Sequence, residues 1–372
     1  MQYRKFNKIN VEVSPIGFGC MRFPVSDPDD KSTIVKEEAM KMVRHAIDNG
    51  VNYLDTAWMY HNFKSEDFMG EVLQDGYREK VHLATKLPIW LVESEDDVMK
   101  YLDIQLEKLK TDHVDFYLIH GLEKDRWEKV KKLNVLAKLE EARAMGKFKY
   151  LGFSFHDTCD VFKEIIDGYD WDFYQIQFNY INTSYQAGFE GLRYAAEKGI
   201  SAIIMEPLLG GKLANLTPVV EERISKERSQ VEWALDFLWS QPEIAVVLSG
   251  MSTMDQVEGN LEYAGRWEER QLKEDDYEML RGVKEIFDKM ALVPCTKCNY
   301  CMPCPFGLNI PGIFEAYNQT ASVSTSFALK TYAQYEVKAD ECRACRRCEK
   351  ECPQHIEISE FMKKAAKALV DA

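Results

Sequence analysis

Short apolar runs alternate with longer stretches of helical periodicity over most of this chain. Between Val13 and about Gly265, eight runs rich in β-branched and aromatic residues are each followed by a segment whose apolar positions have helical spacing. The predicted strands occupy residues 14–19, 51–57, 81–87, 113–121, 150–156, 172–180, 201–207 and 245–250. Their nearly continuous apolar character is typical of parallel strands that are buried on both faces. The pattern predicts an α/β fold.

Eight repeats of strand and helix predict a closed (β/α)8 TIM barrel. An open doubly wound sheet is the alternative, but the first strand-to-helix turn, GFGC followed by MRFP, lacks the G-x-G-x-x-G fingerprint of that fold. Residues 3–14 alternate like a short hairpin, which we expect to close the lower end of the barrel. Ser94 and Asp97 have the spacing of a helix capping box, and Gly50 and Gly199 follow helices where a left-handed residue is needed.

Composition and charge narrow the class of protein. The 372 residues include 46% hydrophobic and 29% charged residues, which are ordinary globular values, and the formal net charge is −14. An acidic chain of this kind does not bind nucleic acid through a basic surface. The N-terminal residues lack the apolar core of a secretory signal, and no apolar run is long enough to cross a membrane. We therefore expect a cytoplasmic protein with neither nucleic-acid nor membrane partners.

Cysteines concentrate near the C-terminus in two groups, CTKCNYCMPCP at residues 295–305 and CRACRRCEKECP at residues 342–353. The second group has the C-x2-C-x2-C-x3-C-P spacing of ferredoxins with two [4Fe-4S] clusters, in which the fourth cysteine binds the other cluster. The first group has one residue fewer before its last cysteine. The predicted ligand sets are Cys295, Cys298, Cys301 with Cys352, and Cys342, Cys345, Cys348 with Cys304.

Thiols in the cytoplasm are kept reduced, so clustered cysteines favour metal binding over disulfides. The alternative to an iron–sulfur cluster at these thiols is a zinc ion. Zinc explains neither the tight triplets nor the proline after each group. Residues 305–341 between the groups have helical patterning, so the region resembles an α-helical ferredoxin. We predict a barrel domain at 1–290 and a small, mainly α-helical ferredoxin-like domain at 291–372. The strongly charged helical stretch at 266–290 is expected to be a solvated outer helix and linker.

Candidate catalytic residues occur where the predicted strands end. In a barrel of this kind the carboxyl ends of the strands surround the active site. Three successive strands end in LDTAWMY, ATK and LIH, which bring Asp55, Tyr60, Lys86 and His120 to one rim. A carboxylate, a phenol, an amine and an imidazole together can form a proton-donating group, whereas each alone is more often structural.

Together and in this order, these residues resemble the catalytic tetrad of the aldo-keto reductase family. The resemblance covers roughly residues 1–290. MQYRKFNKINVEVSPIGFGCMR is similar to that family's N-terminal hairpin and first strand, and LDTAWMY is similar to its D-T-A-x-x-Y signature. The resemblance implies an NAD(P)-dependent oxidoreductase that interconverts a small-molecule carbonyl and an alcohol.

The resemblance also implies a role for each member of the tetrad. Tyr60 would donate a proton to the substrate carbonyl while the nicotinamide supplies hydride. Because a free phenol has a pKa near ~10, we expect Lys86 to favour its ionised form and Asp55 to hold Lys86 charged and oriented. His120 would hydrogen-bond the carbonyl oxygen.

The expected cofactor contacts match the family less evenly. Ser154 and Gln175 are similar to family residues that hydrogen-bond the nicotinamide carboxamide, although Phe155 stands where the family usually has Asn. Met205 takes the place of an aromatic residue that often stacks on the nicotinamide, and a thioether can pack on a ring face.

The segment SGMSTMDQVEGN resembles the family's site for the dinucleotide phosphate and adenosine, because a helix N-terminus suits an anion. Its candidate ligands are Ser252, Thr253, Gln256 and Asn260. The basic residues that commonly hold a 2′-phosphate are missing from this segment, so NADP and NAD stay open as alternatives.

Three functions are compatible with a reductase-like barrel that is followed by a two-cluster domain. In the first, the clusters exchange electrons with a protein partner during a redox reaction at the barrel mouth. In the second, they are structural and the barrel reduces carbonyls alone. In the third, an inactive barrel senses bound nicotinamide, which an intact tetrad argues against. A nicotinamide transfers a hydride pair and a cluster transfers single electrons, so direct exchange calls for a flavin or a radical-tolerant substrate. No flavin fingerprint is visible, although barrels bind flavin without one.

Overall fold

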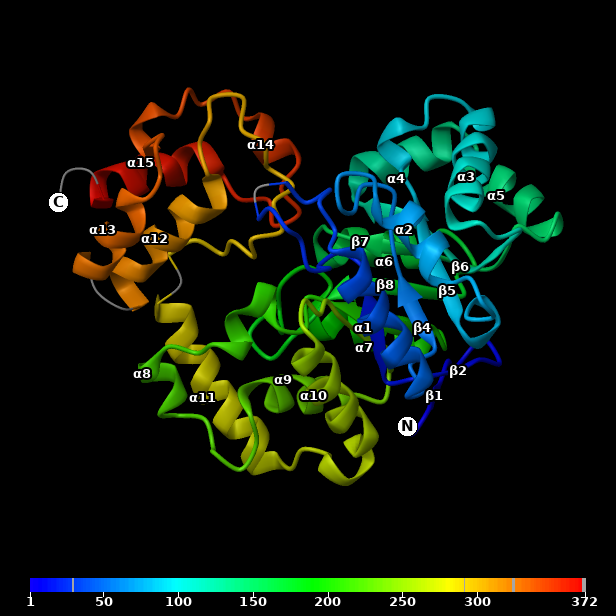
Figure 1. Ribbon diagram of the computed structural model, residues 1–372, viewed down its shortest axis with the longest axis horizontal. Coiled ribbons are helices and arrows are strands. Elements are labelled where there is room, and N and C mark those ends of the chain that lie inside the picture. The colour runs from blue at the N-terminus through cyan, green and yellow to red at the C-terminus, as the bar shows by residue number, and fades with distance from the viewer. Residues whose placement is uncertain (29, 291, 323–324, 370–372) are drawn as a thin grey trace. The chain divides into compact units, whose positions relative to one another are not determined.

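The computed structural model describes residues 1–28, 30–290, 292–322 and 325–369 (Figure 1). The chain divides into two compact units, one made of Met1–Pro207 with Leu235–Leu272 and the other of Leu208–Ala234 with Lys273–Ala372. The second unit therefore includes a segment from the middle of the chain. Residue 291, where the second domain is predicted to begin, lies outside the described residues. The predicted domain boundary stays a prediction.

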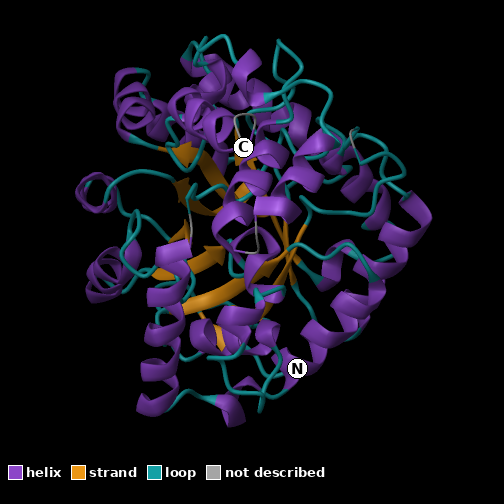
Figure 2. Ribbon diagram, turned by 90° about the vertical axis from the view of Figure 1, so that its left-hand side faces the viewer, coloured by secondary structure: helices purple, strands orange, loops and turns teal. Residues whose placement is uncertain are grey.

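The first unit holds a closed barrel of eight parallel strands in the order β10-β3-β4-β5-β6-β7-β8-β9. Each predicted strand is present, which confirms the predicted TIM barrel. The strands are β3 Ile16–Gly19, β4 Tyr53–Asp55, β5 His82–Leu87, β6 Val114–Leu122, β7 Phe148–Phe155, β8 Phe173–Gln177, β9 Ser201–Met205 and β10 Ile244–Ser249. Helices surround them (Figure 2).

A hairpin closes the amino-terminal end of the barrel, as predicted. Strand β1 (Arg4–Lys5) pairs antiparallel with β2 (Glu12–Val13). The ring of Phe6 between them lies 5.4 Å from that of Phe116 and 6.3 Å from that of Phe173. All three side chains belong to one buried apolar cluster. This packing leaves the opposite, carboxyl end of the barrel for chemistry.

The helices of the first unit begin and end largely where local signals indicate. The backbone N–H of Ser94 donates to Asp97 Oδ2 at 2.9 Å, so the predicted capping box forms. Gly50 and Gly199 have φ of 96° and 75°, which other residues rarely adopt. The helices are α1 Lys36–Asp48, α2 Ser65–Val72, α3 Glu95–Leu109, α4 Lys124–Lys132, α5 Val135–Ala144, α6 Cys159–Asp167, α7 Gly188–Glu197 and α10 Met254–Gly265, with short 3-10 turns η1 Arg78–Lys80, η2 Ile89–Leu91 and η4 Trp267–Arg270. Helix α9 (Gln230–Trp239) runs from the second unit into the first.

The second unit is helical, as predicted for the region between the cysteine groups. Its helices are α8 Pro218–Glu221, α11 Glu274–Met290, α12 Ile310–Ser322, α13 Thr325–Ala333, α14 Arg347–Lys350 and α15 Ile358–Leu369, with 3-10 turns η3 Leu209–Ala214 and η5 Ala339–Glu341. Helix α11 buries Leu280 and Val283 and otherwise carries exposed or half-buried side chains, in line with the predicted solvated helix. Ile313, Phe314 and Met362 form the centre of the apolar core.

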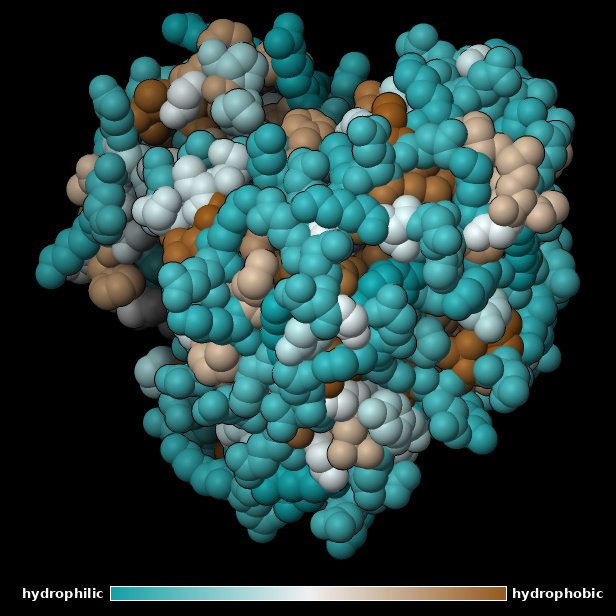
Figure 3. All heavy atoms as spheres, turned by 45° about the vertical axis from the view of Figure 1, so that its right-hand side comes forward, coloured by the Kyte–Doolittle hydropathy of each residue, from teal (hydrophilic) through white to brown (hydrophobic). Residues whose placement is uncertain are grey.

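The face of the molecule in Figure 3 is mostly polar. On the face shown in Figure 3, hydrophobic residues occupy separate patches within a largely hydrophilic surface. Across the described residues, the helices lack the combination of length and apolar character needed to cross a membrane.

Candidate active site

The carboxyl ends of three neighbouring strands carry the four candidate catalytic residues. Asp55 is the last residue of β4, Lys86 is the last but one of β5, and His120 lies near the end of β6. Tyr60 lies in the turn that follows β4. The barrel thus brings all four residues to one rim, as the sequence predicts.

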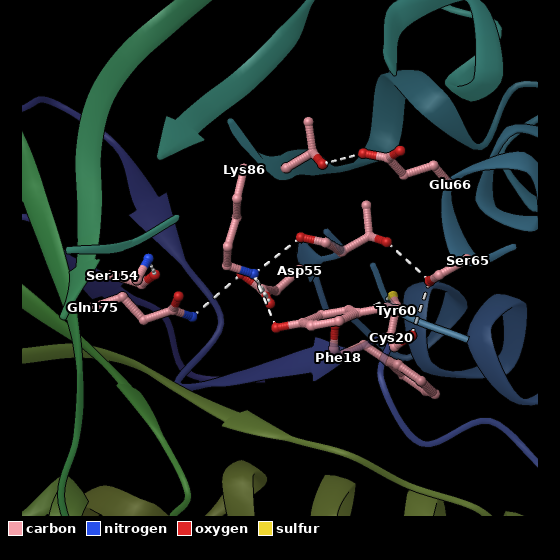
Figure 4. A network of polar contacts seen from close by, with 12 residues as sticks. Phe18, Cys20, Asp55, Tyr60, Ser65, Glu66, Lys86, Ser154 and Gln175 are labelled. Atoms are coloured by element: carbon pink, nitrogen blue, oxygen red, sulfur yellow. Dashed lines mark hydrogen bonds and ion pairs between the residues drawn. The ribbon is translucent and has the colours of Figure 1, made fainter. Parts of the chain in front are cut away.

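Lys86 links two other members of the tetrad, Asp55 and Tyr60 (Figure 4). Its Nζ donates hydrogen bonds to Asp55 Oδ1 at 2.6 Å, to the backbone oxygen of Thr56 at 2.9 Å and to the Tyr60 hydroxyl at 3.2 Å. The side chains of Lys86 and Asp55 are 1% and 3% exposed. The ring of His120 meets that of Tyr60 edge-on, with centroids 6.2 Å apart. A buried cation therefore lies between a carboxylate and a phenol.

The protonation states differ in one respect from the sequence-based expectation. Desolvation, followed by the Asp55 carboxylate, raises the pKa of Tyr60 well above its ordinary value, so the attraction of Lys86 does not lower it overall. Burial also raises the pKa of Asp55, against the opposing effect of Lys86. Burial and the Lys86 charge hold the pKa of His120 well below its usual range. The phenol is thus protonated and the imidazole neutral at neutral pH.

Two of the expected nicotinamide contacts lie beside the tetrad. Gln175, in the middle of β8, donates from Nε2 to Asp55 Oδ2 at 3.3 Å. Ser154, near the end of β7, accepts a hydrogen bond on Oγ from the backbone N–H of Gly121 at 2.7 Å, next to His120. Both side chains are buried.

Two buried polar atoms without hydrogen-bond partners indicate whether the residues at this rim fit a nicotinamide. Gln175 Oε1 and His120 Nδ1 are buried and have no hydrogen-bond partner within the described part of the chain. Buried polar atoms are nearly always paired, so each of these atoms suits a polar group of a bound molecule. The residues present therefore fit an amide-bearing cofactor and a carbonyl substrate. Met205, the last residue of β9, is half-buried, and its backbone oxygen accepts a hydrogen bond from Phe178.

The expected phosphate site forms the N-terminus of α10. Thr253 is the N-cap and accepts from the backbone N–H of Gln256, whose Oε1 accepts from the backbone N–H of Ser252 at 2.8 Å. Ser252 Oγ donates to the backbone oxygen of Arg22, and Asn260 Nδ2 donates to Ser249 Oγ. These four side chains thus have structural partners already.

Arg22 is a cation that sequence reasoning missed. Its side chain packs against Gly250, where an added Cβ would lie 3.0 Å from Arg22 Cδ. Arg22, from the segment after β3, thus lies beside the α10 segment, which has no basic residue of its own.

In the second unit, four cysteines surround one cavity. They are Cys295, Cys298, Cys301 and Cys352, which is the predicted crossed ligand set. Burial raises the pKa of the Cys352 thiol, against backbone N–H donors of residues 354–356. Among the described residues, no three His, Cys, Asp or Glu side chains converge as a metal ion requires. A [4Fe-4S] cluster instead spreads its four thiolates over separate corners, and the four thiols that line this cavity match such a group in kind and number of donors.

The second predicted ligand set, Cys342, Cys345, Cys348 and Cys304, is supported for three of its four cysteines. Burial, Glu349 and the neighbouring thiols Cys342 and Cys345 raise the pKa of Cys348 to about 11, so these three cysteines lie near one another. Cys304 packs against the same apolar core. Its place in the second ligand set stays a prediction.

Comparison with known proteins decides the class of the barrel. The family model for the aldo/keto reductase family matches residues 15–285. The chain belongs to the aldo/keto reductase family. A model for a 4Fe-4S dicluster domain matches residues 294–357, so this aldo/keto reductase is an oxidoreductase that carries an iron–sulfur domain.

Its relatives agree with this assignment. The chain is 26% identical over 318 residues to the uncharacterized oxidoreductase YqkF of Bacillus subtilis, covering 76% of this chain and 96% of the relative. It is 25% identical to an L-galactose dehydrogenase of Arabidopsis thaliana, covering 70% and 87% of the two chains. An aldo-keto reductase from Bacillus halodurans in its holo form shares the fold, with a TM-score of 0.64 at 23% identity over 76% of this chain and 96% of that chain.

The first turn of α2 supports the tetrad of this aldo/keto reductase from behind (Figure 4). Ser65 Oγ donates to the backbone oxygen of Cys20 at 2.9 Å and lies 2.9 Å from Thr56 Oγ1. The backbone oxygen of Thr56 in turn accepts the hydrogen bond from Lys86. The start of α2 therefore fixes Thr56, the residue after β4 whose backbone oxygen accepts the hydrogen bond from Lys86.

A second buried contact runs through Glu66. Its Oε1 accepts hydrogen bonds from Thr85 Oγ1 at 2.6 Å and from Gln105 Nε2. Gln105 Nε2 also donates to the backbone oxygen of Lys86 at 3.0 Å, and its Oε1 accepts from Tyr117. Sequence reasoning missed these residues. A glutamine on the apolar stripe of α3 was the signal that could have found them.

Proposed function

We propose that this aldo/keto reductase interconverts a small-molecule carbonyl and an alcohol with NADPH or NADH. The observation that carries the proposal is the position of Lys86 Nζ, 2.6 Å from Asp55 and 3.2 Å from the Tyr60 hydroxyl. Bound NAD(P)H would supply a hydride to the carbonyl carbon. The protein must then supply one proton to the carbonyl oxygen.

Tyr60 is the proton donor in this proposal. Its raised pKa keeps the phenol protonated at neutral pH, which is the form that reduction uses. As the proton leaves, negative charge develops on the phenol oxygen, and the hydrogen bond from Lys86 stabilises it. The ion pair with Asp55 holds the Lys86 ammonium in position within a buried site, and solvent returns the proton to Tyr60 after product release.

His120 orients the substrate. Its low pKa leaves a neutral imidazole, which can donate one hydrogen bond to the carbonyl oxygen without competing with Tyr60 as an acid. Trp90 packs at 5.1 Å from the imidazole ring and helps to fix its position. The two groups thus divide positioning and proton donation between them.

The nucleotide would lie between the tetrad and α10. Gln175 and Ser154 would bind the nicotinamide amide, and Met205 would pack on its ring. The N-terminus of α10, with Ser252, Thr253, Gln256 and Asn260, would face the phosphates. Arg22 supports this assignment because its backbone oxygen accepts a hydrogen bond from Ser252 Oγ, which places a basic residue beside that helix start.

Replacing Tyr60 by Phe tests the proposal. The variant keeps the ring and removes the transferable proton, so carbonyl reduction should fall roughly 100-fold to 10,000-fold while nucleotide affinity changes little. Tyr77→Phe is the matched control, because Tyr77 bonds Asp48 away from the tetrad. Carbonyl reduction that survives Tyr60→Phe unchanged would falsify the assignment.

We propose further that two clusters exchange electrons with a protein carrier in the cytoplasm. Together two clusters hold two electrons, which is the number that one hydride carries, and a bound flavin that accepts the hydride would pass these electrons to the clusters one at a time. Cys345 is exposed, unlike the other seven cysteines of the two groups, and electrons can enter or leave most readily at an exposed edge. Anaerobic addition of NADPH or NADH should then produce the paramagnetic signal of reduced clusters.

A structural role for the clusters is the second candidate. Six of the eight cysteines pack against the apolar core of the second unit, so metal loss would remove part of that core. In this case nicotinamide addition leaves the clusters oxidised, and iron removal unfolds the second unit. The paramagnetic measurement separates the two candidates.

A further inference from the structure

Thr296 carries a buried hydroxyl that the protein itself does not satisfy. The residue lies between Cys295 and Lys297 and is 1% exposed. Its Oγ1 has no hydrogen-bond partner within the described residues. A buried, unpaired hydroxyl is costly, and such a group in a native structure usually has an unseen partner or a redox role. The side chain therefore points to a ligand.

The surroundings identify the ligand. Thr296 lines the cavity that Cys295, Cys298, Cys301 and Cys352 surround. Much of the remaining lining is apolar and includes Ile310, Phe314, Ile356 and Ile358. Asn299 and Gln354 add two polar side chains to this lining. Four thiols in a largely apolar cavity suit a thiolate-bound group, and the domain is of the 4Fe-4S type.

The backbone around Thr296 is closely packed. Gly210, in the same compact unit, has φ of 67°, and a Cβ added there would lie 2.1 Å from the backbone oxygen of Thr296. The backbone N–H of Lys297 donates to Cys295 Sγ at 3.5 Å. Thr296 is thus held between a close backbone contact and a cysteine ligand.

We propose that the Thr296 hydroxyl donates a hydrogen bond to a sulfur of the cluster held by Cys295, Cys298, Cys301 and Cys352, and thereby raises the reduction potential of this cluster. A reduced cluster carries one more negative charge than an oxidised one, so a donor to its sulfur stabilises the reduced form more. Thr296 is a tuning residue and does not itself ligate iron. The inference depends on the cluster assignment and is independent of carbonyl reduction by the barrel.

The test uses full-length holoprotein under anaerobic conditions. Clusters are poised at known potentials and followed by paramagnetic resonance. Thr296→Val keeps the shape and removes the donor, so the ratio of reduced to oxidised first cluster at a fixed potential should fall roughly tenfold, equivalent to about 59 mV for one electron. The second cluster should not shift and serves as an internal reference. Thr296→Ser keeps a hydroxyl and should restore most of the wild-type potential.

Three outcomes would overturn the proposal. They are an unchanged potential in Thr296→Val, an equal shift of both clusters, and a serine variant that behaves like the valine variant. Should Thr296→Val fail to retain iron, Thr296→Ala gives the same comparison, since alanine cannot overfill the cavity. Carbonyl reduction measured on the same samples tells whether the barrel remains active. A failure of the tuning role is thus distinct from a failure of the proposed enzymatic function.

Discussion

Gln105 holds the backbone of Lys86 from behind: its Nε2 donates to the Lys86 carbonyl oxygen at 3.0 Å. The two residues come from α3 and β5, and the contact is fully buried. The lysine at the centre of the tetrad is therefore positioned by a glutamine that does not face the substrate.

Gln105→Leu tests this positioning role. The change leaves buried partners of the amide unpaired, which should cost about 1–3 kcal/mol of unfolding free energy for each group. A small displacement of Lys86 should lower kcat roughly 10-fold to 100-fold with little change in nucleotide KM. Glu107→Leu, at an exposed position of the same helix, is the control. Equal losses in both variants, or a loss confined to KM, would contradict positioning.

The pH dependence of reduction follows from the protonation states. Because the pKa of Tyr60 is raised above its ordinary value of about 10, the phenol stays protonated and reduction should be level from about pH 7 to about pH 9. His120 remains neutral over this range because its pKa is lowered. Alcohol oxidation needs the deprotonated phenol and should rise with pH. Single-turnover rates provide the measurement, and a decline of reduction between these pH values would refute the proton donor.

The buried pair of Asp55 and Lys86 should be costly to break on one side only. Asp55→Ala leaves a buried ammonium without its carboxylate, which should destabilise the barrel by about 3–5 kcal/mol in urea denaturation. Asp55→Leu combined with Lys86→Met removes both charges and should recover much of that loss. At the surface pair of Lys36 and Glu71, Glu71→Ala should cost less than about 1 kcal/mol. Similar costs at both pairs would show that burial does not govern the interaction.

Paired cysteine substitutions test the crossed ligand sets. If Cys301 and Cys352 bind the same cluster, the double alanine variant should lose one cluster and keep about half of the iron. If Cys304 binds the other cluster, Cys301→Ala with Cys304→Ala should lose both. Iron and sulfide analysis with paramagnetic resonance separates these outcomes. The reverse result would show that each cysteine group binds its own cluster.

The sequence allowed the barrel to be predicted because each strand is a continuous apolar run, and this pattern depends on local burial alone. Asp55, Tyr60, Lys86 and His120 could be predicted because strand ends of a barrel share one rim. The partners of Gln105 could not, since a glutamine on an apolar stripe indicates burial but does not reveal which groups of other elements its amide meets. The raised pKa of Tyr60 was also out of reach, because it depends on desolvation by the whole fold.

The position of the segment Leu208–Ala234 affects whether the barrel can be produced without the cysteine-rich region. This segment follows barrel strand β9 and includes the first half of helix α9, yet it belongs to the compact unit that carries the cysteines. We expect a gene truncated before Cys295 to produce an insoluble polypeptide, because Gly210 and its neighbours would lose the backbone they pack against. The reductase and the iron–sulfur module are interleaved along the chain. Recombination at a single junction cannot exchange one without breaking the other.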